Sequence, residues 1–125
     1  MIIGIGTDVV DLERFGNTME QYGERFMKRM YTNVEREYCM RFPSPREHFA
    51  ARFAAKEALL KAIGTGKTRQ VKWTDIEIYN EPAGQPMMRL CGCAEDIFRS
   101  LGGRALHVSL THSRLVAAAV VVIEA

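Results

Sequence analysis

Two short segments carry charged side chains at positions where a folded chain normally places small or apolar ones. Residues 4–12, Gly-Ile-Gly-Thr-Asp-Val-Val-Asp-Leu, put the Asp8 carboxylate on a predicted buried strand. Residues 52–66 put Glu57 and Lys61 on a predicted helix that is otherwise rich in alanine and other apolar residues. Because a buried charge is costly unless it is paired or binds something, both segments are candidate functional sites.

Asp8 and Glu57 are candidate ligands for a hard cation. Two carboxylates in small-residue or apolar surroundings repel each other unless one is protonated or a cation lies between them. Mg²⁺ commonly takes one or two protein carboxylates and completes its octahedral shell with water and substrate phosphate oxygens. A structural interpretation is also open, in which Glu57 pairs with Lys61 one turn away and Asp8 caps a helix start.

Two other groups of polar residues are able to contact a ligand. Residues 64–67, Gly-Thr-Gly-Lys, follow the charged helix, and backbone N–H groups in such a loop can bind phosphate. Glycine at a helix end is also an ordinary stop signal, so both interpretations stay open. His107, Ser109 and Thr111 lie on one face of a predicted strand, where a histidine is more often a structural hydrogen-bonding group than a catalyst.

Two common active-site motifs are absent from the sequence. No Asp or Cys stands at a spacing that would complete a hydrolase triad, and no G-x-S-x-G motif is present. The glycines of residues 4–6 resemble the start of a dinucleotide-binding loop, but Val9 stands where that loop needs its third glycine. No strand–helix–strand unit with an acidic end follows, so we exclude this loop as well.

A helix over residues 45–63 must position Glu57 and Lys61. At about 100° per residue, its large apolar side chains form one stripe, and Lys56 falls inside that stripe. Alanine covers most of the remaining circumference, which predicts a helix surrounded by protein on several sides, and Gly64 provides its C-terminal stop. The alanines are Ala50, Ala51, Ala54, Ala55, Ala58 and Ala62.

The order of predicted elements favours an α+β fold with a mostly antiparallel sheet packed on this long buried helix. The 125 residues suffice for one domain, residues 1–125, and are too few for two ordinary ones. A strand over residues 2–10 points Gly4, Gly6 and Asp8 to one face, which allows something to approach its backbone closely. Between residues 11 and 41 the sequence predicts two short helical pieces, in a pattern weakened by Gly16 and Gly23, and then a further helix to about Met40 that starts at a capping box over residues 32–35. The other predicted elements are a helix start that Ser44 can cap, a hairpin over residues 76–79 and 87–91, a helix over residues 94–101, and strands over residues 105–111 and 115–124.

Composition and charge limit the function classes. The chain is 47% hydrophobic and 26% charged, as in ordinary globular proteins, and its net charge of +2 gives no support for a protein that coats nucleic acid. Basic residues nevertheless gather in residues 25–36, where only Glu35 opposes them. They form either a docking face or an ordinary solvated helix surface. These basic residues are Arg25, Lys28, Arg29 and Arg36.

The sequence predicts a cytoplasmic protein without a membrane segment. Cys39, Cys91 and Cys93 are odd in number and match no metal-binding spacing, which favours reduced thiols. Residues 1–3 run straight into Gly and Asp with no basic start or cleavage site, so we expect no signal peptide. The apolar run over residues 115–123 is too short to span a bilayer.

Taken together, these motifs closely resemble those of the bacterial holo-acyl-carrier-protein synthases, the short class of 4′-phosphopantetheinyl transferases. The family's G-I-G-x-D motif stands at residues 4–8, and its R-F-A-x-K-E-A-x-x-K-A-x-G-T-G motif is complete over residues 52–66. Its H-V-S-[IL]-[ST]-H strand stands at residues 107–112, and its small apolar ending at residues 117–124. The likeness covers essentially the whole chain and implies the 4′-phosphopantetheinyl transferase fold.

The resemblance implies transfer of phosphopantetheine from coenzyme A to a serine of acyl carrier protein, which leaves adenosine 3′,5′-bisphosphate and supports fatty acid biosynthesis. It implies that Asp8 and Glu57 hold Mg²⁺, and that Lys61 neutralises charge at the scissile phosphate. Glu57 and Lys61 are thus the implied catalytic residues, although the group that deprotonates the serine stays open between them and a metal-bound water. The attacking serine belongs to the partner, so this chain needs no nucleophile. The implied coenzyme A contacts are Arg46, Arg52, Lys61, Gly64, Thr65, Gly66, His107 and Thr111, with Arg46 the candidate for the 3′-phosphate.

The resemblance also implies partners. The family is a homotrimer with sites between subunits, so we expect the alanine-rich helix and the apolar C-terminal strand at a subunit interface. Acyl carrier proteins are acidic, which gives the exposed basic residues a role in steering association. The implied docking residues are Arg14, Arg25, Lys28 and Arg29. A non-catalytic metal- or nucleotide-binding module that kept the fold is the alternative, and intact Asp8, Glu57 and Lys61 argue against it.

Overall fold

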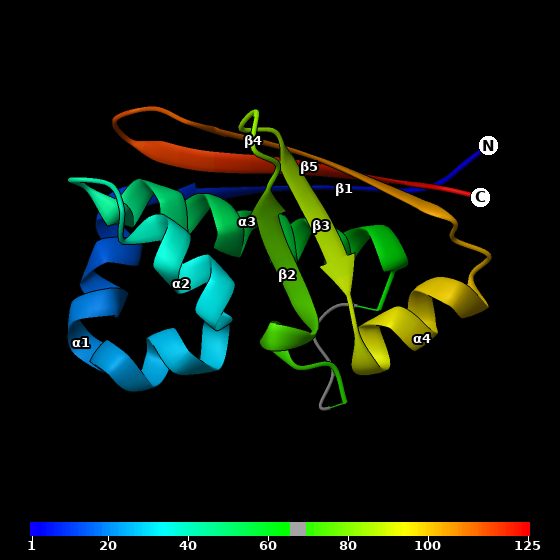
Figure 1. The fold of residues 1–125 in the computed structure, drawn as a ribbon, viewed down its shortest axis with the longest axis horizontal. Coiled ribbons are helices and arrows are strands. Elements are labelled where there is room, and N and C mark those ends of the chain that lie inside the picture. Colours follow the sequence, from blue (N-terminus) through cyan, green and yellow to red (C-terminus); the bar gives the residue numbers. More distant parts are fainter. Residues whose placement is uncertain (66–69) are drawn as a thin grey trace.

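A three-stranded antiparallel sheet lies against one long helix at the centre of the molecule (Figure 1). The strands follow the order β1–β5–β4, so that β5 pairs with a neighbour on each side. The computed structural model describes residues 1–65 and 70–125. The central elements are β1 (Ile2–Asp11), α3 (Pro45–Ile63), β4 (Ala105–His112) and β5 (Val116–Glu124).

The remaining elements surround the long helix. In Figure 1, α2 and the β2–β3 hairpin cross in front of α3, while α1 and α4 lie at opposite ends of the molecule. The α+β class with a mostly antiparallel sheet is therefore confirmed. Within the described part of the chain, no helix combines the length and apolar character needed to cross a bilayer. These elements are α1 (Leu12–Met30), α2 (Asn33–Cys39), the 3₁₀ turn η1 (Trp73–Asp75), β2 (Ile76–Asn80), β3 (Pro86–Leu90) and α4 (Gly92–Ser100).

The helix α3 has the predicted bounds and is enclosed by its own chain. Gly64 ends it in the left-handed conformation with φ of 80°, and the Gly64 N–H donates to the carbonyls of Leu60 and Lys61. Most of its alanines are fully buried within a single chain, as Ala54 and Ala58 illustrate. Elements of the same chain therefore cover these alanines, and the expectation that this helix lies at a subunit interface stays a prediction.

The two predicted helix caps have different outcomes. At Thr32 the capping box is confirmed, since its hydroxyl accepts the Glu35 N–H and the Glu35 carboxylate accepts the Thr32 N–H at 3.0 Å. Ser44 occupies the cap position of α3 but makes no side-chain hydrogen bond to the helix backbone, so the predicted cap is wrong. The Ser44 hydroxyl instead bonds the Glu47 carboxylate, and this hydrogen bond lowers the pKa of Glu47.

The first helical region is divided into two pieces, as predicted, and the break lies at Gly23. Gly23 has φ of 59° and breaks the helical path of α1. Gly16 instead lies inside a continuous helical stretch, where a Cβ would be 2.9 Å from the Arg46 Cδ. The glycine at this position therefore leaves room for the arginine side chain that crosses the helix.

The strand β1 approaches α3 closely because its inner face carries two glycines. A Cβ on Gly6 would overlap the backbone carbonyl of Ala58, and one on Gly4 would overlap that of Ala62. Asp8 follows on the same face of the strand. The element that approaches the predicted glycine face is thus α3, and the close contact brings the Asp8 carboxylate beside the helix.

Candidate active site

A pocket of about 360 Å³ opens where the end of β1, the start of α1 and the middle of α3 meet. Asp8 and Glu57, from separate sequence segments, both line this pocket. The structure therefore brings the two predicted carboxylates to one cavity with partly aromatic walls. Its other lining residues are Val9, Val10, Asp11, Arg14, Phe15, Thr18, Phe26 and Phe53.

Lys61 hydrogen-bonds Asp8 rather than Glu57. The Lys61 Nζ donates to the Asp8 Oδ1 at 3.0 Å and to the backbone carbonyl of Thr7 at 2.9 Å. The helix start after β1 is capped by Asp11, whose carboxylate accepts a backbone N–H of the first turn. The structural interpretation, with a Glu57–Lys61 pair and Asp8 as the helix cap, is therefore wrong on both points.

Glu57 lies half-buried, one turn before Lys61 on α3. Burial raises the pKa of Glu57, the negative charge of Asp8 raises it further, and Lys61 opposes the shift. The two carboxylates therefore repel each other, and a cation between them would relieve that repulsion. Among the described residues, no cluster of three or more His, Cys, Asp or Glu side chains could hold a metal. Two carboxylates nevertheless fit Mg²⁺, because water and substrate phosphate commonly supply its other ligands.

The predicted coenzyme A contacts fall into groups that one chain does not bring together. Lys61, Gly64 and Thr65 are exposed at the C-terminal end of α3. Arg46 lies at the opposite end, roughly 27 Å away along the helix axis, where it lines a groove against α1. Gly66 lies outside the described residues. A single phosphate therefore cannot contact both ends of α3 in the same chain.

Arg52 is almost completely buried, with 2% of its surface exposed. Its guanidinium lies 4.4 Å from the centre of the Tyr38 ring and donates to the Asn80 side-chain carbonyl. Tyr38 and Asn80 line a second pocket, of about 370 Å³, between α2 and the hairpin. Arg52 and Glu57 point roughly 140° apart around the α3 axis. Arg52 therefore belongs to the hairpin side of α3, and Glu57 to the β1 side.

His107 and Thr111 lie on the outer face of the three-stranded sheet. Both are exposed, whereas alternate residues of β4, such as Leu110, pack against the core. His107 Nε2 contacts the Glu124 carboxylate on the neighbouring strand. Asp8 lies on the inner face, so the sheet separates these two residues of a single chain from the carboxylate pocket.

The predicted docking residues are all exposed on α1. Arg14 lines the rim of the carboxylate pocket, which places one basic side chain directly beside the candidate site. Arg25, Lys28 and Arg29 follow the Gly23 break, toward the end of the helix. The same helix, α1, therefore carries the pocket rim and the basic residues, but its path bends at Gly23 between them.

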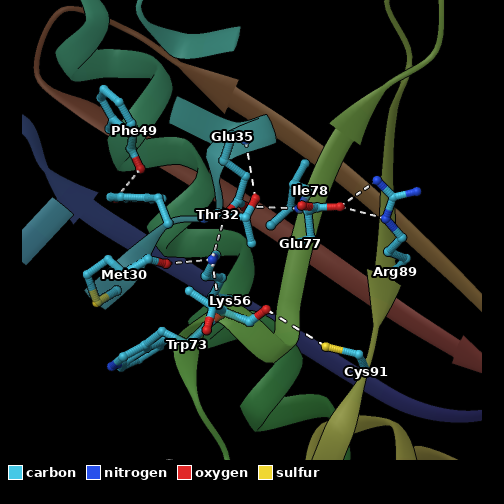
Figure 2. Close-up of polar contacts among 12 residues, drawn as sticks. Met30, Thr32, Glu35, Phe49, Lys56, Trp73, Glu77, Ile78, Arg89 and Cys91 are labelled. Atoms are coloured by element: carbon cyan, nitrogen blue, oxygen red, sulfur yellow. Dashed lines mark hydrogen bonds and ion pairs between the residues drawn. The ribbon is translucent and has the colours of Figure 1, made fainter. Parts of the chain in front are cut away.

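A buried ion pair behind the site was not predicted as a pair. The Lys56 Nζ lies 2.8 Å from the Glu35 Oε1, and both side chains are fully buried (Figure 2). The sequence marks Lys56 as a charge in an apolar stripe and Glu35 as the end of a capping box. A buried lysine requires a buried acid, but tertiary packing alone selects which of the 15 acidic residues it is.

A sequence profile described as the 4′-phosphopantetheinyl transferase superfamily matches residues 4–119. Because that match spans nearly the whole chain, the chain belongs to the 4′-phosphopantetheinyl transferase superfamily. It is 44% identical to the holo-[acyl-carrier-protein] synthase of Koribacter versatilis (strain Ellin345), with 99% of each chain covered. It is 47% identical to the protein of the same name from Methylobacterium radiotolerans, with 100% of this chain and 95% of that one covered.

Solved structures agree with this assignment. The holo-[acyl-carrier-protein] synthase of Neisseria meningitidis superposes with a TM-score of 0.89 at 33% identity, covering 100% of both chains. The Helicobacter pylori synthase, solved in complex with coenzyme A, superposes with a TM-score of 0.85 at 27% identity, covering 96% of this chain and 99% of that one. The family inferred from the motifs is therefore confirmed.

Proposed function

We propose that this chain is a holo-[acyl-carrier-protein] synthase, which transfers the 4′-phosphopantetheine group of coenzyme A to a serine of an apo acyl carrier protein. The other product is adenosine 3′,5′-bisphosphate. The observation that carries the proposal is the meeting of Asp8, Glu57 and Lys61 beside one pocket. The names of the relatives and the coenzyme A complex of the Helicobacter pylori neighbour support it. The reaction would take place in the cytoplasm and support fatty acid biosynthesis.

Asp8 and Glu57 are the residues that would hold Mg²⁺. When bound, Mg²⁺ would supply positive charge to the pyrophosphate oxygens of coenzyme A. Lys61 fixes the Asp8 carboxylate by a hydrogen bond, and its half-exposed ammonium can neutralise charge that develops on the phosphate. The proton of the attacking serine would pass to Glu57, to a metal-bound water, or to Lys61 if that side chain is a neutral amine at that step.

We further propose a homotrimer in which each complete site lies between two subunits. His107 and Thr111 lie on the outer sheet face, away from the carboxylate pocket of their own chain, so in this proposal those of a neighbouring copy would complete the site. The same face exposes large apolar side chains, including Ile5 at 60% and Val9 at 65%. An apolar face of this kind fits coverage by another protein surface. Arg52 is buried against Tyr38 and Asn80, so its contact with the nucleotide stays a prediction.

The carrier protein would dock on the basic face of α1. Because Arg14 lines the same pocket as Asp8 and Glu57, a carrier held by this face would have its serine near the two carboxylates. The charges of Arg25, Lys28 and Arg29 are exposed and therefore suited to steer an acidic partner rather than to form its buried contacts.

The direct test is incubation of the chain with coenzyme A, Mg²⁺ and an apo acyl carrier protein, followed by intact-mass measurement of the carrier. We expect a mass gain equal to one phosphopantetheine group, and loss of that gain when a chelator removes the metal. No gain across several acidic carriers would leave the non-catalytic binding module as the better hypothesis.

Glu57→Gln is the matched variant for this assay, because it keeps the shape of the side chain and removes its charge. Loss of a group that stabilises transition-state charge typically costs about 100-fold or more in rate, so we expect transfer to fall at least that far. Near-normal transfer by the folded variant would remove Glu57 from the metal site.

A further inference from the structure

The buried Lys56–Glu35 pair joins five segments of the chain (Figure 2). The Lys56 Nζ donates to the Glu35 Oε1 at 2.8 Å and to two backbone carbonyls, of Met30 at 2.6 Å and of Trp73 at 3.0 Å. The other carboxylate oxygen of Glu35 accepts the backbone N–H of Ile78 at 3.0 Å. One residue of α3 is thereby tied to the end of α1, to α2, to η1 and to β2.

This network and the β1 glycines hold α3 from two sides, immediately around Glu57. Lys56 precedes Glu57 and anchors the helix to the α2 and hairpin side. Ala58 follows Glu57 and carries the carbonyl against which Gly6 packs. A rotation or slide of the helix at Glu57 would break contacts on one side or create overlap on the other.

Stability alone does not account for this arrangement. Replacing a buried ion pair with well-packed apolar side chains is often neutral or stabilising, so such a pair is weak support for a purely stabilising role. A pair whose hydrogen bonds reach separate segments instead specifies one arrangement of those segments. Here the arrangement sets the direction in which α3 presents its next residue.

We propose that Lys56 and Glu35 are positioning residues, which fix the rotation of α3 so that the Glu57 carboxylate stays beside Asp8. This inference rests on the proposed role of Asp8 and Glu57 as the metal ligands. Neither Lys56 nor Glu35 touches the pocket, so both act only through the helix. In other proteins, residues outside the ligand set orient metal ligands by direct hydrogen bonds; here the orientation would be set through the helix backbone.

The test is binding of Mn²⁺, without coenzyme A or carrier protein, measured by electron paramagnetic resonance. The main variant is Lys56→Met with Glu35→Gln, which removes both buried charges together and leaves neither unpaired. Loss of an orienting contact typically weakens metal affinity about 10-fold to 100-fold, and we expect the lower end of that range. Glu35→Asp keeps both charges but shortens the acidic side chain, and it serves as a milder variant, with a smaller weakening, if the double variant does not fold.

Two comparisons separate the possible outcomes. Ile76→Val reduces packing in the same fully buried layer without touching the pair, and should bind Mn²⁺ as the wild type does. Unchanged Mn²⁺ affinity in a folded pair variant, with weakened affinity in Glu57→Gln, would overturn the positioning role alone. Unchanged affinity in Glu57→Gln would overturn the metal assignment, and with it this inference.

Discussion

At the scale of single residues, absent side chains matter as much as charged ones. Gly4 and Gly6 place the β1 backbone against the carbonyls of Ala62 and Ala58, with no room for a Cβ. Asp8 comes next on this face and reaches Lys61 at 3.0 Å. The glycines of the first motif therefore allow β1 to lie close to α3, and this close packing brings the Asp8 carboxylate beside the helix.

Gly6→Ala tests this close approach. The added methyl group would meet backbone, which cannot rotate away, so β1 must move from α3. Overpacking of this kind typically costs about 1–3 kcal/mol of unfolding free energy, and we expect at least that loss in urea denaturation. Metal affinity should fall as well, because Asp8 moves with the strand. An unchanged unfolding midpoint would contradict the packing described for this face.

At the scale of elements, α1 connects the pocket to the exposed basic face. Its first turn follows directly from β1 and is capped by Asp11, so Arg14 is held at the pocket rim. Its last turn carries Lys28 and Arg29, and the carbonyl of its last residue, Met30, accepts a hydrogen bond from Lys56. The same helix thus offers charge to a partner and contacts the network behind Glu57.

Arg14→Ala and Lys28→Ala test the docking role of this element. Both side chains are exposed, so folding should be unaffected, while the attraction to an acidic carrier weakens. We expect the KM for the carrier to rise at low salt with little change in kcat, and the difference from wild type to shrink as salt screens the charges. The matched control is Arg99→Ala on α4, which should leave the KM unchanged. Equal kinetics for all variants would place docking on another surface.

At the scale of the whole molecule, the predicted site residues divide between two faces. Asp8, Glu57 and Lys61 gather on the inner side of the sheet, whereas His107 and Thr111 lie on its outer side. Under the proposed function, one chain would therefore carry two partial sites on opposite faces of its sheet. A symmetric assembly can bring such halves together, because each copy presents the same two surfaces.

Mixing of two inactive variants tests whether sites form between subunits. One variant is Glu57→Gln, and the other carries His107→Ala and Thr111→Ala. If each site takes one half from each of two neighbours, random mixed assemblies should contain about one quarter fully wild-type sites. We therefore expect transfer activity to appear after co-expression or refolding of an equal mixture, although neither variant is active alone. If verified mixed assemblies recover no activity, these residues do not combine from two subunits into one site.

The sequence by itself determined the features that depend on neighbours along the chain. The bounds of α3, its Gly64 stop, the Thr32 capping box and the alternating strands follow from local propensity and periodicity. The long motif over residues 52–66 likewise marked Glu57 and Lys61 as functional candidates before any contact was known.

Only the tertiary structure decided which distant groups meet. It paired Lys61 with Asp8 and Lys56 with Glu35, buried Arg52 beside Tyr38, and set His107 on the face opposite Asp8. Each of these arrangements involves residues far apart in sequence. Local sequence patterns report only on near neighbours along the chain and therefore cannot predict them. The face that α3 turns toward β1, and therefore the direction of Glu57, results from packing among all of these elements together.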